Sequence, residues 1–551
     1  MKKSKSIIAL AIAMLMCLSI LAACGGGDDT NTSSDPSASA EPSVAAPFQE
    51  GQAAPDSPAP TGTDVVFAEE IIIITDNNDI SVLNSFLPSA GAPPVSWTTN
   101  MVYDRLIYPL GGGQYEPYLA LDWTEEVIDG NQVLTFWLRE DVYFHNGENL
   151  TASDVVFTLE KAGEDMTGTN HGYWHPTGFN VTASALDTYT VQIVLDRIFV
   201  DYLFNLSNPY CWIASEKAMR DDPLNGYMVG SGAFKYVEFV PSNYWVVERN
   251  DDYWGEPAIT RQVTFRFIPE QGTRTIMMLN GEAQLSFGIS GEDMEIFETS
   301  DDFQLFPFTF NNPNCISFNM DDPILADWNF RMAVASALDR AEIAVVAAGA
   351  YAAPDYSGSL WGFSTEFRND TLDQIPEDLD AARAYLEASI YAGEEIEIAS
   401  SILTYTKQAE IIQQQLARIG ILTTLNVMDP PAMTAYTDRN NNQSQITSGL
   451  VVMTEAASSY RGAIYPEATG NRVMYDNERI GELLDLAMGE LDQDIRRGYW
   501  FEIQEILAQD IPRINTFWRL NAAVAVPGIG GFALPSTALY DLRYIYWQIE
   551  G

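Results

Sequence analysis

Basic residues are scarce in this chain of 551 residues, which has 29 lysines and arginines against 76 aspartates and glutamates. A formal charge of −47 leaves no long basic stripe to neutralise phosphates, so we expect no nucleic-acid partner. Four cysteines and three histidines exclude a disulfide-built scaffold and leave little room for a multi-histidine metal site. We therefore expect neither a metal nor a cofactor.

Signatures of common catalysts are also missing. The chain has no Gly-x-Ser-x-Gly elbow, no His-Glu-x-x-His motif and no Walker loop. A glycoside hydrolase needs two carboxylates with separate roles, and among 76 acidic residues suggestive pairs arise by chance. The lack of repeats argues against a surface adhesin. A binding protein that is not an enzyme is favoured, with a secreted glycoside hydrolase as the alternative.

The N-terminus has the features of an export signal. Lysines precede an apolar run, Ile7–Leu21, which is shorter than the ~20 residues of a membrane-spanning helix and fits a signal peptide. The run leads into Leu-Ala-Ala-Cys-Gly at residues 21–25, which resembles a bacterial lipobox. We predict that residues 1–23 are removed and that Cys24 carries a lipid anchor on the outer face of the cell membrane, on its extracellular or periplasmic side.

Residues 24–64 contain Gly, Ser, Thr, Ala, Pro and Asp with almost no large apolar side chain, which predicts a disordered tether. The body that follows mixes two periodicities. Glu70–Thr75 is a β-branched run typical of a buried strand, and Thr151–Asp154 has capping-box spacing before a helix. Helical spacing from Ile412 stops at Gly420 and is followed by strand-like alternation, so we predict an α/β fold.

Six stretches of the body occur in an order found in a known family. They are Tyr115–Trp123, Phe136–Arg139, Val142–Gly147, Leu150–Phe157, Val229–Phe234 and Arg249–Gly255. The first four resemble a block with Leu-Ala and Trp, a strand ending in Leu-Arg, then Phe-His-Asp-Gly and Thr-Ala-Asp-Asp-Val. The last two resemble a Gly-Thr-Gly-Pro-Tyr turn and Arg-Asn-Pro-x-Tyr-Trp. The chain thus resembles the family 5 extracellular solute-binding proteins, the peptide receptors of ABC importers.

This resemblance implies a bilobal periplasmic-binding-protein-like flytrap (type II, cluster C) with an extra subdomain inserted in the first lobe. The implied parts are lobe I at 65–315 plus 516–551, its inserted subdomain at about 106–225, and lobe II at 316–515. Asn311–Asn319 and Ile514–Trp518 are the expected hinge strands. Closure would be driven by ligand contacts that are better made in the closed state.

The function implied by the resemblance is capture of oligopeptides or dipeptides by lobe closure. The monomeric receptor would deliver them to the transmembrane subunits of an ABC permease and, through these, to the ATPase. Oligosaccharides or a metal complex are alternative ligands for the same receptor class. A strongly anionic solute is the least expected ligand, because removal of the signal peptide makes the chain still more acidic.

One acidic residue is a candidate for binding the ammonium group of a ligand. By resemblance, an Asp in a Trp-x-x-Asp loop of lobe II pairs with the α-ammonium of a peptide. The corresponding stretch, Leu450–Arg461, lacks the Trp and has Ala456 or Ala457 near the Asp position. Glu455 is the only acid nearby, which puts simple dipeptide recognition in doubt.

Other candidates are aromatic or basic residues in loops and at loop ends. Trp97, Tyr173, Trp174 and Trp361 could stack on a ligand or line a side-chain pocket, with lobe packing as the alternative for each. Tyr460 and Arg461 could supply a hydroxyl and a carboxylate-pairing guanidinium, or lie on the surface.

The sequence leaves the roles of two further pairs of residues open. His171 and His175 are four apart, as in metal-binding helices, but Gly172 and Pro176 oppose a regular helix there. Cys211 and Cys315 could form a disulfide in an oxidising exterior, and the sequence does not show their distance.

Overall fold

The computed structural model describes most of the chain from Val66 to Ile549. The described residues are 66–75, 84, 86, 99–111, 113–164, 170–176, 178–289, 291–309, 313–357, 367–450, 457–468, 470–532 and 542–549. All of them fall within Phe48–Gly551, one of two compact units of the chain. The predicted signal peptide, the tether and Cys24 lie outside the described residues. The candidates Trp97, Trp361 and Glu455 also lie outside them.

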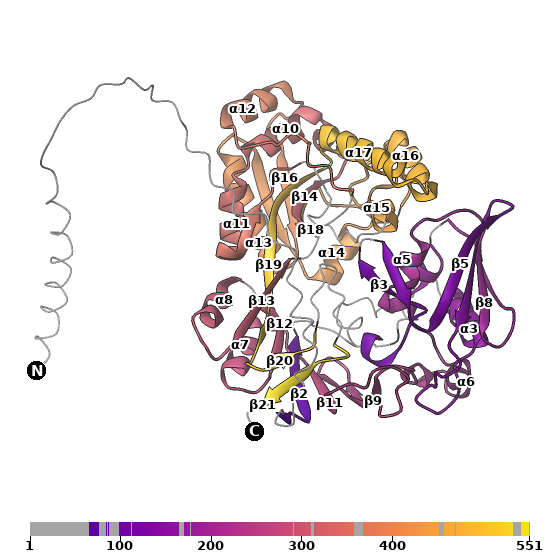
Figure 1. Cartoon of the computed structure of the whole chain (residues 1–551). Coiled ribbons are helices and arrows are strands. Elements are labelled where there is room, and N and C mark those ends of the chain that lie inside the picture. The colour runs from indigo at the N-terminus through magenta and orange to yellow at the C-terminus, as the bar shows by residue number, and fades with distance from the viewer. Residues whose placement is uncertain are drawn as a thin grey trace, which may run out of the picture. The chain divides into compact units, whose positions relative to one another are not determined.

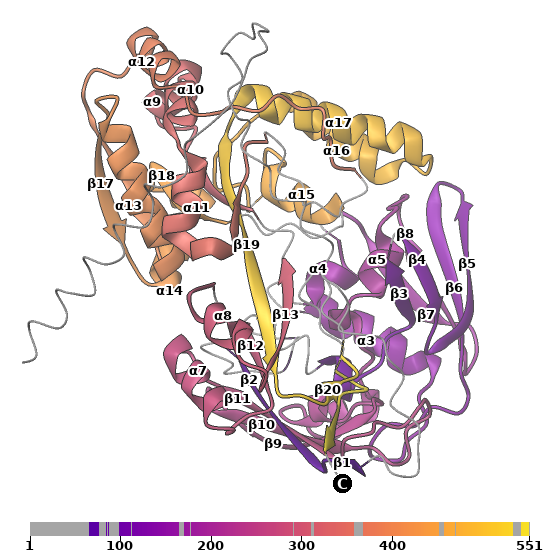
Figure 2. The same cartoon turned by 60° about the vertical axis from the view of Figure 1, so that its left-hand side comes forward.

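One long strand, β19 (Arg513–Ala525), joins two groups of strands in a twelve-stranded mixed sheet. Its first part pairs with β14 (Asn314–Phe318), and its last part with β12 (Leu285–Ile289) and β13 (Gln304–Thr309). Since β13 and β14 follow each other in the chain, two chain passages link the groups (Figure 1, Figure 2). We call the group around β12 lobe I and that around β14 lobe II. The expected hinge strands include β14 and the first part of β19, and the lobe boundaries stay a prediction.

Lobe I continues the sheet from β12 through β2, β11 and β10 to β9. Its elements are β1 (Val66–Phe67), β2 (Glu70–Thr75), β9 (Phe234–Val240), β10 (Tyr244–Arg249), β11 (Gln262–Phe267), α7 (Gln271–Leu279), α8 (Gly291–Glu298), β20 (Ile529–Gly530) and β21 (Tyr546–Ile549). The β-branched run of β2 is the buried strand that the sequence predicts, and it pairs in parallel with β11 and β12. Strand β21 pairs with β1, so lobe I holds both ends of the described chain.

A second, four-stranded antiparallel sheet lies within the range predicted for the inserted subdomain, in the order β5-β6-β8-β7. Its elements are β3 (Ile107–Gly111), β4 (Gln114–Pro117), β5 (Ala120–Ile128), β6 (Asn131–Leu138), α3 (Ala152–Glu164), α4 (His171–Trp174), β7 (Val181–Ala185), β8 (Thr190–Leu195), α5 (Tyr202–Leu206) and α6 (Glu216–Asp221). Half of the capping box is present at α3: the Thr151 N–H donates to Asp154 Oδ2 over 2.9 Å, while the Asp154 N–H donates to the Thr151 carbonyl over 3.1 Å.

Lobe II places its strands in the order β17-β16-β18-β14-β19. Its elements are α9 (Pro323–Ala326), α10 (Trp328–Ala337), α11 (Arg340–Ala348), β15 (Ala352–Pro354), α12 (Leu379–Ala388), β16 (Glu395–Ser400), α13 (Leu403–Ala417), β17 (Leu422–Val427), α14 (Pro430–Tyr436), β18 (Ile446–Leu450), α15 (Ala457–Ile464), α16 (Glu478–Gly489) and α17 (Gln493–Asp510). The predicted stop after α13 is confirmed, since Gly420 has φ +90°. Some of the many aspartates serve as helix N-caps, for example Asp339 at α11 and Asp492 at α17.

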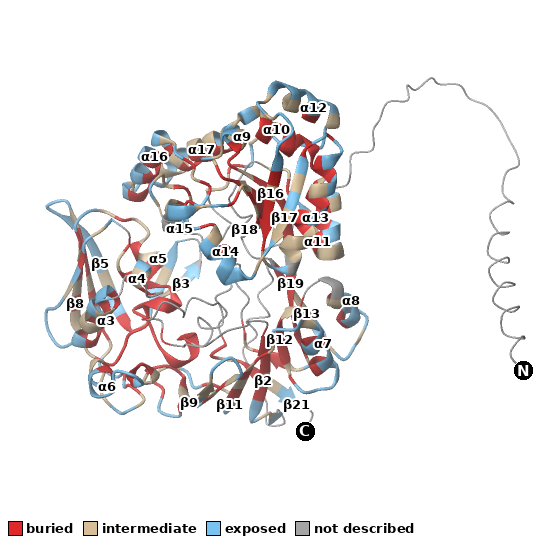
Figure 3. Cartoon of the chain, turned by 180° about the vertical axis from the view of Figure 1, so that it is seen from behind, coloured by how far each residue is buried: buried red, intermediate tan, exposed pale blue. Residues whose placement is uncertain are grey.

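Buried side chains concentrate on central strands such as β2 and β14, while outer strands such as β5 and β17 carry exposed residues (Figure 3). The inserted subdomain also contacts lobe II directly. The Val200 N–H donates to the Met488 carbonyl over 3.1 Å, and Arg496 Nη1 lies 3.7 Å from Asp201 Oδ1. No helix in the described part of the chain is long and apolar enough to cross a membrane.

Two of the family-like stretches meet at His145. Its Nε2 lies 3.0 Å from the Gly232 carbonyl, and its Nδ1 accepts the Gly230 N–H over 3.2 Å. A Cβ at Gly230 would lie 1.9 Å from the Val102 carbonyl oxygen, so the turn approaches another segment too closely for any larger residue. The imidazole is therefore neutral, with Nε2 as donor and Nδ1 as acceptor, and it holds this glycine turn in place.

This arrangement predicts a pH dependence of stability. Burial, the largest cause, lowers the pKa of His145 from 6.5 to about 4. The unfolded chain therefore binds a proton that the folded protein resists, and stability falls as the pH drops from about 6.5 to about 4. In urea unfolding between pH 7 and pH 4.5, His145→Gln should remove a slope of up to about 1.4 kcal/mol per pH unit. His171→Gln is the control for loss of a histidine, and an unchanged slope in His145→Gln would contradict the assignment.

Candidate functional site

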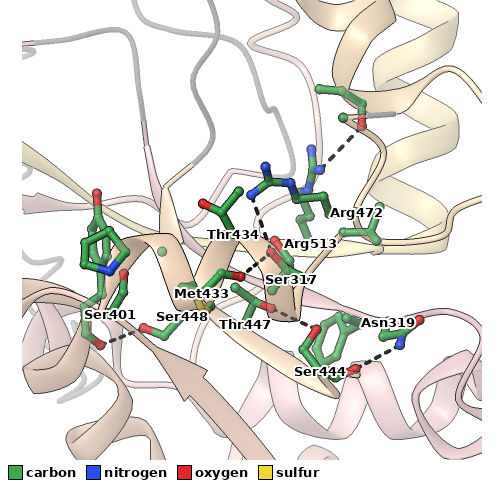
Figure 4. Close-up of a pocket in the computed structure, with 18 of the residues that line it drawn as sticks. Ser317, Asn319, Ser401, Met433, Thr434, Ser444, Thr447, Ser448, Arg472 and Arg513 are labelled. Carbon is green, nitrogen blue, oxygen red and sulfur yellow. Dashed lines mark hydrogen bonds between the residues drawn. The ribbon is translucent and has the colours of Figure 1, made fainter. Parts of the chain in front are cut away.

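A pocket of about 540 Å³ lies in lobe II, within the size range of small-ligand sites. It is lined by Ser317, Phe318, Asn319, Ser401, Tyr405, Pro430, Met433, Thr434, Thr437, Ser444, Thr447, Ser448, Gly449, Gly462, Ala463, Gly470, Arg472, Val473 and Arg513. These residues come from β14, β18 and β19 and from α14 and α15 and the segments that adjoin them (Figure 4). The pocket is thus built between the lobe II sheet and these two helices.

The strand register explains which side chains face the pocket. Ser317 is the register partner of Thr447 on β18 and of Arg513 on β19. Paired residues project from the same face of a sheet, so these three side chains share one face. The alternate residues Ile316 and Ile514 belong to the core that contains α10, α11 and α13. Ser317, Thr447 and Arg513 therefore lie on the sheet face opposite that core, while Phe318 and Ser448 line the pocket from alternate positions.

Two arginines are the charged residues of this pocket. Arg513 Nη2 lies 3.5 Å from the Ala463 carbonyl at the end of α15. Burial is the main cause that lowers the pKa of Arg513. Arg472 is exposed, and its Nη1 lies 3.4 Å from Thr437 Oγ1. The remaining lining residues are uncharged, with serine and threonine hydroxyls prominent among them.

A buried glutamine fixes the strands that carry the pocket. Gln408 of α13 donates from Nε2 to the Cys315 carbonyl over 3.0 Å and to Ser448 Oγ over 2.9 Å. Its Oε1 accepts the Thr516 hydroxyl over 2.8 Å. One side chain thereby ties α13 to β14, β18 and β19, all three strands of the pocket wall.

The two aromatic candidates on α4 lie in the inserted subdomain. Trp174 is fully buried in the core, so its ring presents no surface to a ligand in this structure. Tyr173 is half-buried and stacks on Tyr210 with ring centroids 5.6 Å apart. Burial, the largest cause, raises the pKa of Tyr173 to about 12, so it is a neutral hydroxyl. Trp174 therefore packs in the core, which is the alternative to ligand binding that the sequence left open.

Tyr460 and Arg461 lie on α15, immediately before the pocket residues Gly462 and Ala463. Tyr460 is 2% exposed and its ring packs near Trp500. Arg461 forms an ion pair with Asp485 and lies over the Tyr465 ring, with Cζ 3.8 Å from the ring centroid. Neither side chain lines the pocket. In this structure both side chains are turned toward other partners.

The two histidines contact backbone carbonyls, and the two cysteines are buried. His171 Nδ1 lies 2.9 Å from the Ala162 carbonyl, and His175 Nε2 lies 2.8 Å from the Leu159 carbonyl, so both contact the end of α3. The described residues contain no group of three metal-ligating side chains. Cys211 and Cys315 are buried free thiols, and burial raises the pKa of both, which makes them unreactive.

Sequence reasoning missed Arg513 and the wall formed by β14 and β18. A signal for Arg513 exists, since it is the single charged residue in the stretch Ile511–Trp518, which includes the expected hinge strand. A charge at an inward position of such a strand indicates a functional side chain. The other lining residues are serines, threonines and glycines with no distinguishing pattern.

Two α/β lobes joined by two strand passages, with a polar pocket in one lobe, define a binding protein of the hinge-closing class. Residues 114–467 match the model of the "Bacterial extracellular solute-binding proteins, family 5 Middle". The chain belongs to this family of bacterial extracellular solute-binding proteins. The resemblance inferred from the sequence is therefore confirmed, and so is the bilobal fold.

Similar proteins cover most of the chain. "Dipeptide-binding protein DppE" from Bacillus subtilis (strain 168) is 23% identical over 512 residues, which are 86% of this chain and 92% of that protein. "Heme-binding protein A" from Haemophilus influenzae is 22% identical over 488 residues, which are 81% and 87% of the two chains. The structure of the periplasmic binding protein DppA from Helicobacter pylori in complex with the peptide STSA has a TM-score of 0.75 at 22% identity. It covers 88% of this chain and 99% of its own.

Proposed function

We propose that this protein captures dipeptides or oligopeptides between its lobes and delivers them to an ABC permease. The pocket of about 540 Å³ in lobe II carries this proposal, because it holds hydroxyls and arginine donors that suit a peptide backbone and its terminus. The relative named as a dipeptide-binding protein and the similar structure that holds the peptide STSA support the same ligand class.

The proposal includes the setting of the receptor. Lobe I would comprise 65–315 plus 516–551 and lobe II 316–515, with closure about β19 and the β13–β14 passage. A lipid on Cys24 would hold the monomer at the outer face of the membrane, and residues 24–64 would give it reach to the permease. The receptor would release its ligand chemically unchanged, as a protein that is not an enzyme does.

A metal complex is the second candidate, because one relative is named as a heme-binding protein. The described residues contain no metal-ligating cluster, so such a complex would be held through its organic part. Thermal unfolding distinguishes the two ligand classes, since a ligand that binds only the folded state raises the melting temperature.

A peptide library should raise the melting temperature of the mature protein. A ligand at 100 times its Kd adds about 2.7 kcal/mol to stability. Mass spectrometry of the complex should then recover the peptide intact. The proposal would be wrong if haem or another metal complex stabilised the protein and no peptide did, or if the bound peptide were cleaved.

A further inference from the structure

The charge of the lobe II pocket is opposite to that of the protein. The chain carries 76 acidic residues against 29 basic ones. The lining residues nevertheless include Arg472 and Arg513 and contain no aspartate or glutamate. The formal charge of this pocket lining is therefore opposite in sign to that of the protein as a whole.

Arg513 is the centre of this positive charge. Its Nε and Nη1 are buried and have no hydrogen-bond partner, and Nη2 has the single long contact of 3.5 Å to the Ala463 carbonyl. A guanidinium keeps its charge in proteins, and an ion that is taken out of water without a counter-charge destabilises the fold. The donors without a partner, on Nε and Nη1, lie on different edges of the guanidinium, and each edge also carries an Nη2–H, so either edge can present two N–H groups to the two oxygens of a carboxylate.

The neighbours of Arg513 do not neutralise it. Its register partner on β14 is Ser317, and the next strand places Thr447 beside them, so the adjacent groups on the sheet are hydroxyls. The Cys315 thiol is also near, and its own raised pKa keeps it uncharged. Arg472 lies at the same end of the pocket and is exposed, which places a second cation at the entrance (Figure 4).

We infer that this pocket binds a carboxylate of the captured solute, with the Arg513 guanidinium as its direct partner and Arg472 drawing it in. The inference rests on the proposed function, because it names a group of the ligand that the receptor captures.

The test compares a peptide that has a free C-terminus with the same peptide amidated, by titration calorimetry on the mature protein. Truncating one member of a buried hydrogen-bonded charge pair costs enough to weaken binding by about 30-fold or more. We therefore expect the wild-type protein to bind the amide at least about 30-fold more weakly than the acid. In Arg513→Met, acid and amide should bind alike, both with the lower affinity.

Two control variants separate binding from structure. Arg472→Met should cause a smaller loss that disappears at high salt, because Arg472 is exposed. Arg383→Met removes an exposed ion pair with Asp380 on α12, outside the pocket, and should leave both affinities unchanged. A purely structural Arg513 would lower the melting temperature of the ligand-free Arg513→Met protein. We expect no decrease, since a buried uncompensated charge is replaced by an apolar chain.

Further ligands identify the source of the carboxylate. An amidated peptide with one glutamate side chain tests a side-chain carboxylate, and succinate tests a free organic acid. Peptide binding with equal affinity for acid and amide, or discrimination that persists in Arg513→Met, would overturn the inference and leave the proposed function standing. If succinate binds through Arg513 and no peptide binds, the carboxylate site stands and the peptide proposal fails. Absence of binding by all of these ligands would overturn both.

Discussion

Replacement of Asp104 with alanine is expected to lower the free energy of unfolding by about 3–5 kcal/mol. Asp104 is 1% exposed in the core of lobe I. Its Oδ1 accepts the hydroxyls of Tyr118 over 2.9 Å and Tyr253 over 3.2 Å. Its Oδ2 accepts Ser231 Oγ over 3.0 Å and Trp254 Nε1 over 2.9 Å. One carboxylate thus accepts from four donors in three separate segments of the chain.

The loss is large because Ser231 and Tyr253 are buried and Tyr118 and Trp254 are half-buried. Burial, and then the negative charge of Asp104, raise the pKa of Tyr118 and Tyr253 well above the usual value, so both remain donors. Arg543 also donates to the Tyr118 hydroxyl and so depends on the same cluster. With alanine at position 104, several buried polar groups lose their acceptor at once, and each such group costs about 1–3 kcal/mol.

Urea unfolding followed by tryptophan fluorescence measures this effect. Asp104→Asn keeps the shape and one acceptor oxygen, so it should lose less stability than Asp104→Ala. Asp221→Ala, which removes an exposed partner of Lys217, should change stability by no more than about 0.5 kcal/mol. A loss below about 1 kcal/mol in Asp104→Ala would show that water replaces the carboxylate and that the cluster is not structural.

The same cluster shows which features a sequence can predict. Local patterns specify local structure, as the Thr151–Asp154 capping box and the stop at Gly420 show. Tyr253 and Trp254 lie in one of the family-like stretches, Arg249–Gly255, and both side chains donate to Asp104. The identity of their acceptor could not be predicted, since it lies about 150 positions away in the chain and depends on tertiary packing.

The candidate site shows the limit more clearly. Trp174 was named as a loop aromatic that could stack on a ligand, and Tyr460 was named for its hydroxyl, yet both are buried in the core. Their burial depends on which elements pack over α4 and α15, and this is not a local property. The net charge of −47 is likewise a sum over the chain and carries no information about the small volume around Arg513. The register of three strands that are distant in sequence creates that site.

The second large effect is expected at Asp355, which ties lobe II to the strand between the lobes. Asp355 is 5% exposed and follows β15. Its Oδ2 accepts Asn515 Nδ2 and Trp518 Nε1, each over 2.9 Å, and its backbone N–H donates to the Thr516 carbonyl over 3.0 Å. All three partners lie in the stretch of β19 that contains the expected hinge strand Ile514–Trp518.

Asp355→Ala should therefore change both stability and ligand binding. Loss of a buried carboxylate that holds two buried donors should cost about 3 kcal/mol in unfolding free energy. Burial lowers the pKa of the nearby Arg340 to about 10, with Asp355 as the main opposing influence, so its removal also leaves a buried cation less compensated. A less restrained β19 should populate open conformations more, and we expect peptide affinity to fall about tenfold.

The control variant acts on the other oxygen of the same carboxylate. Ser357 Oγ donates to Asp355 Oδ1 over 2.6 Å, on the side away from β19. Ser357→Ala should reduce stability by about 1 kcal/mol and leave peptide affinity unchanged, because the contacts to Asn515 and Trp518 remain. Titration calorimetry with a peptide shown to bind the wild-type protein measures the peptide affinity of both variants. If both variants bound that peptide with wild-type affinity, Asp355 would stabilise lobe II without affecting lobe closure. Contacts other than those of Asp355 would then fix the position of β19 during closure.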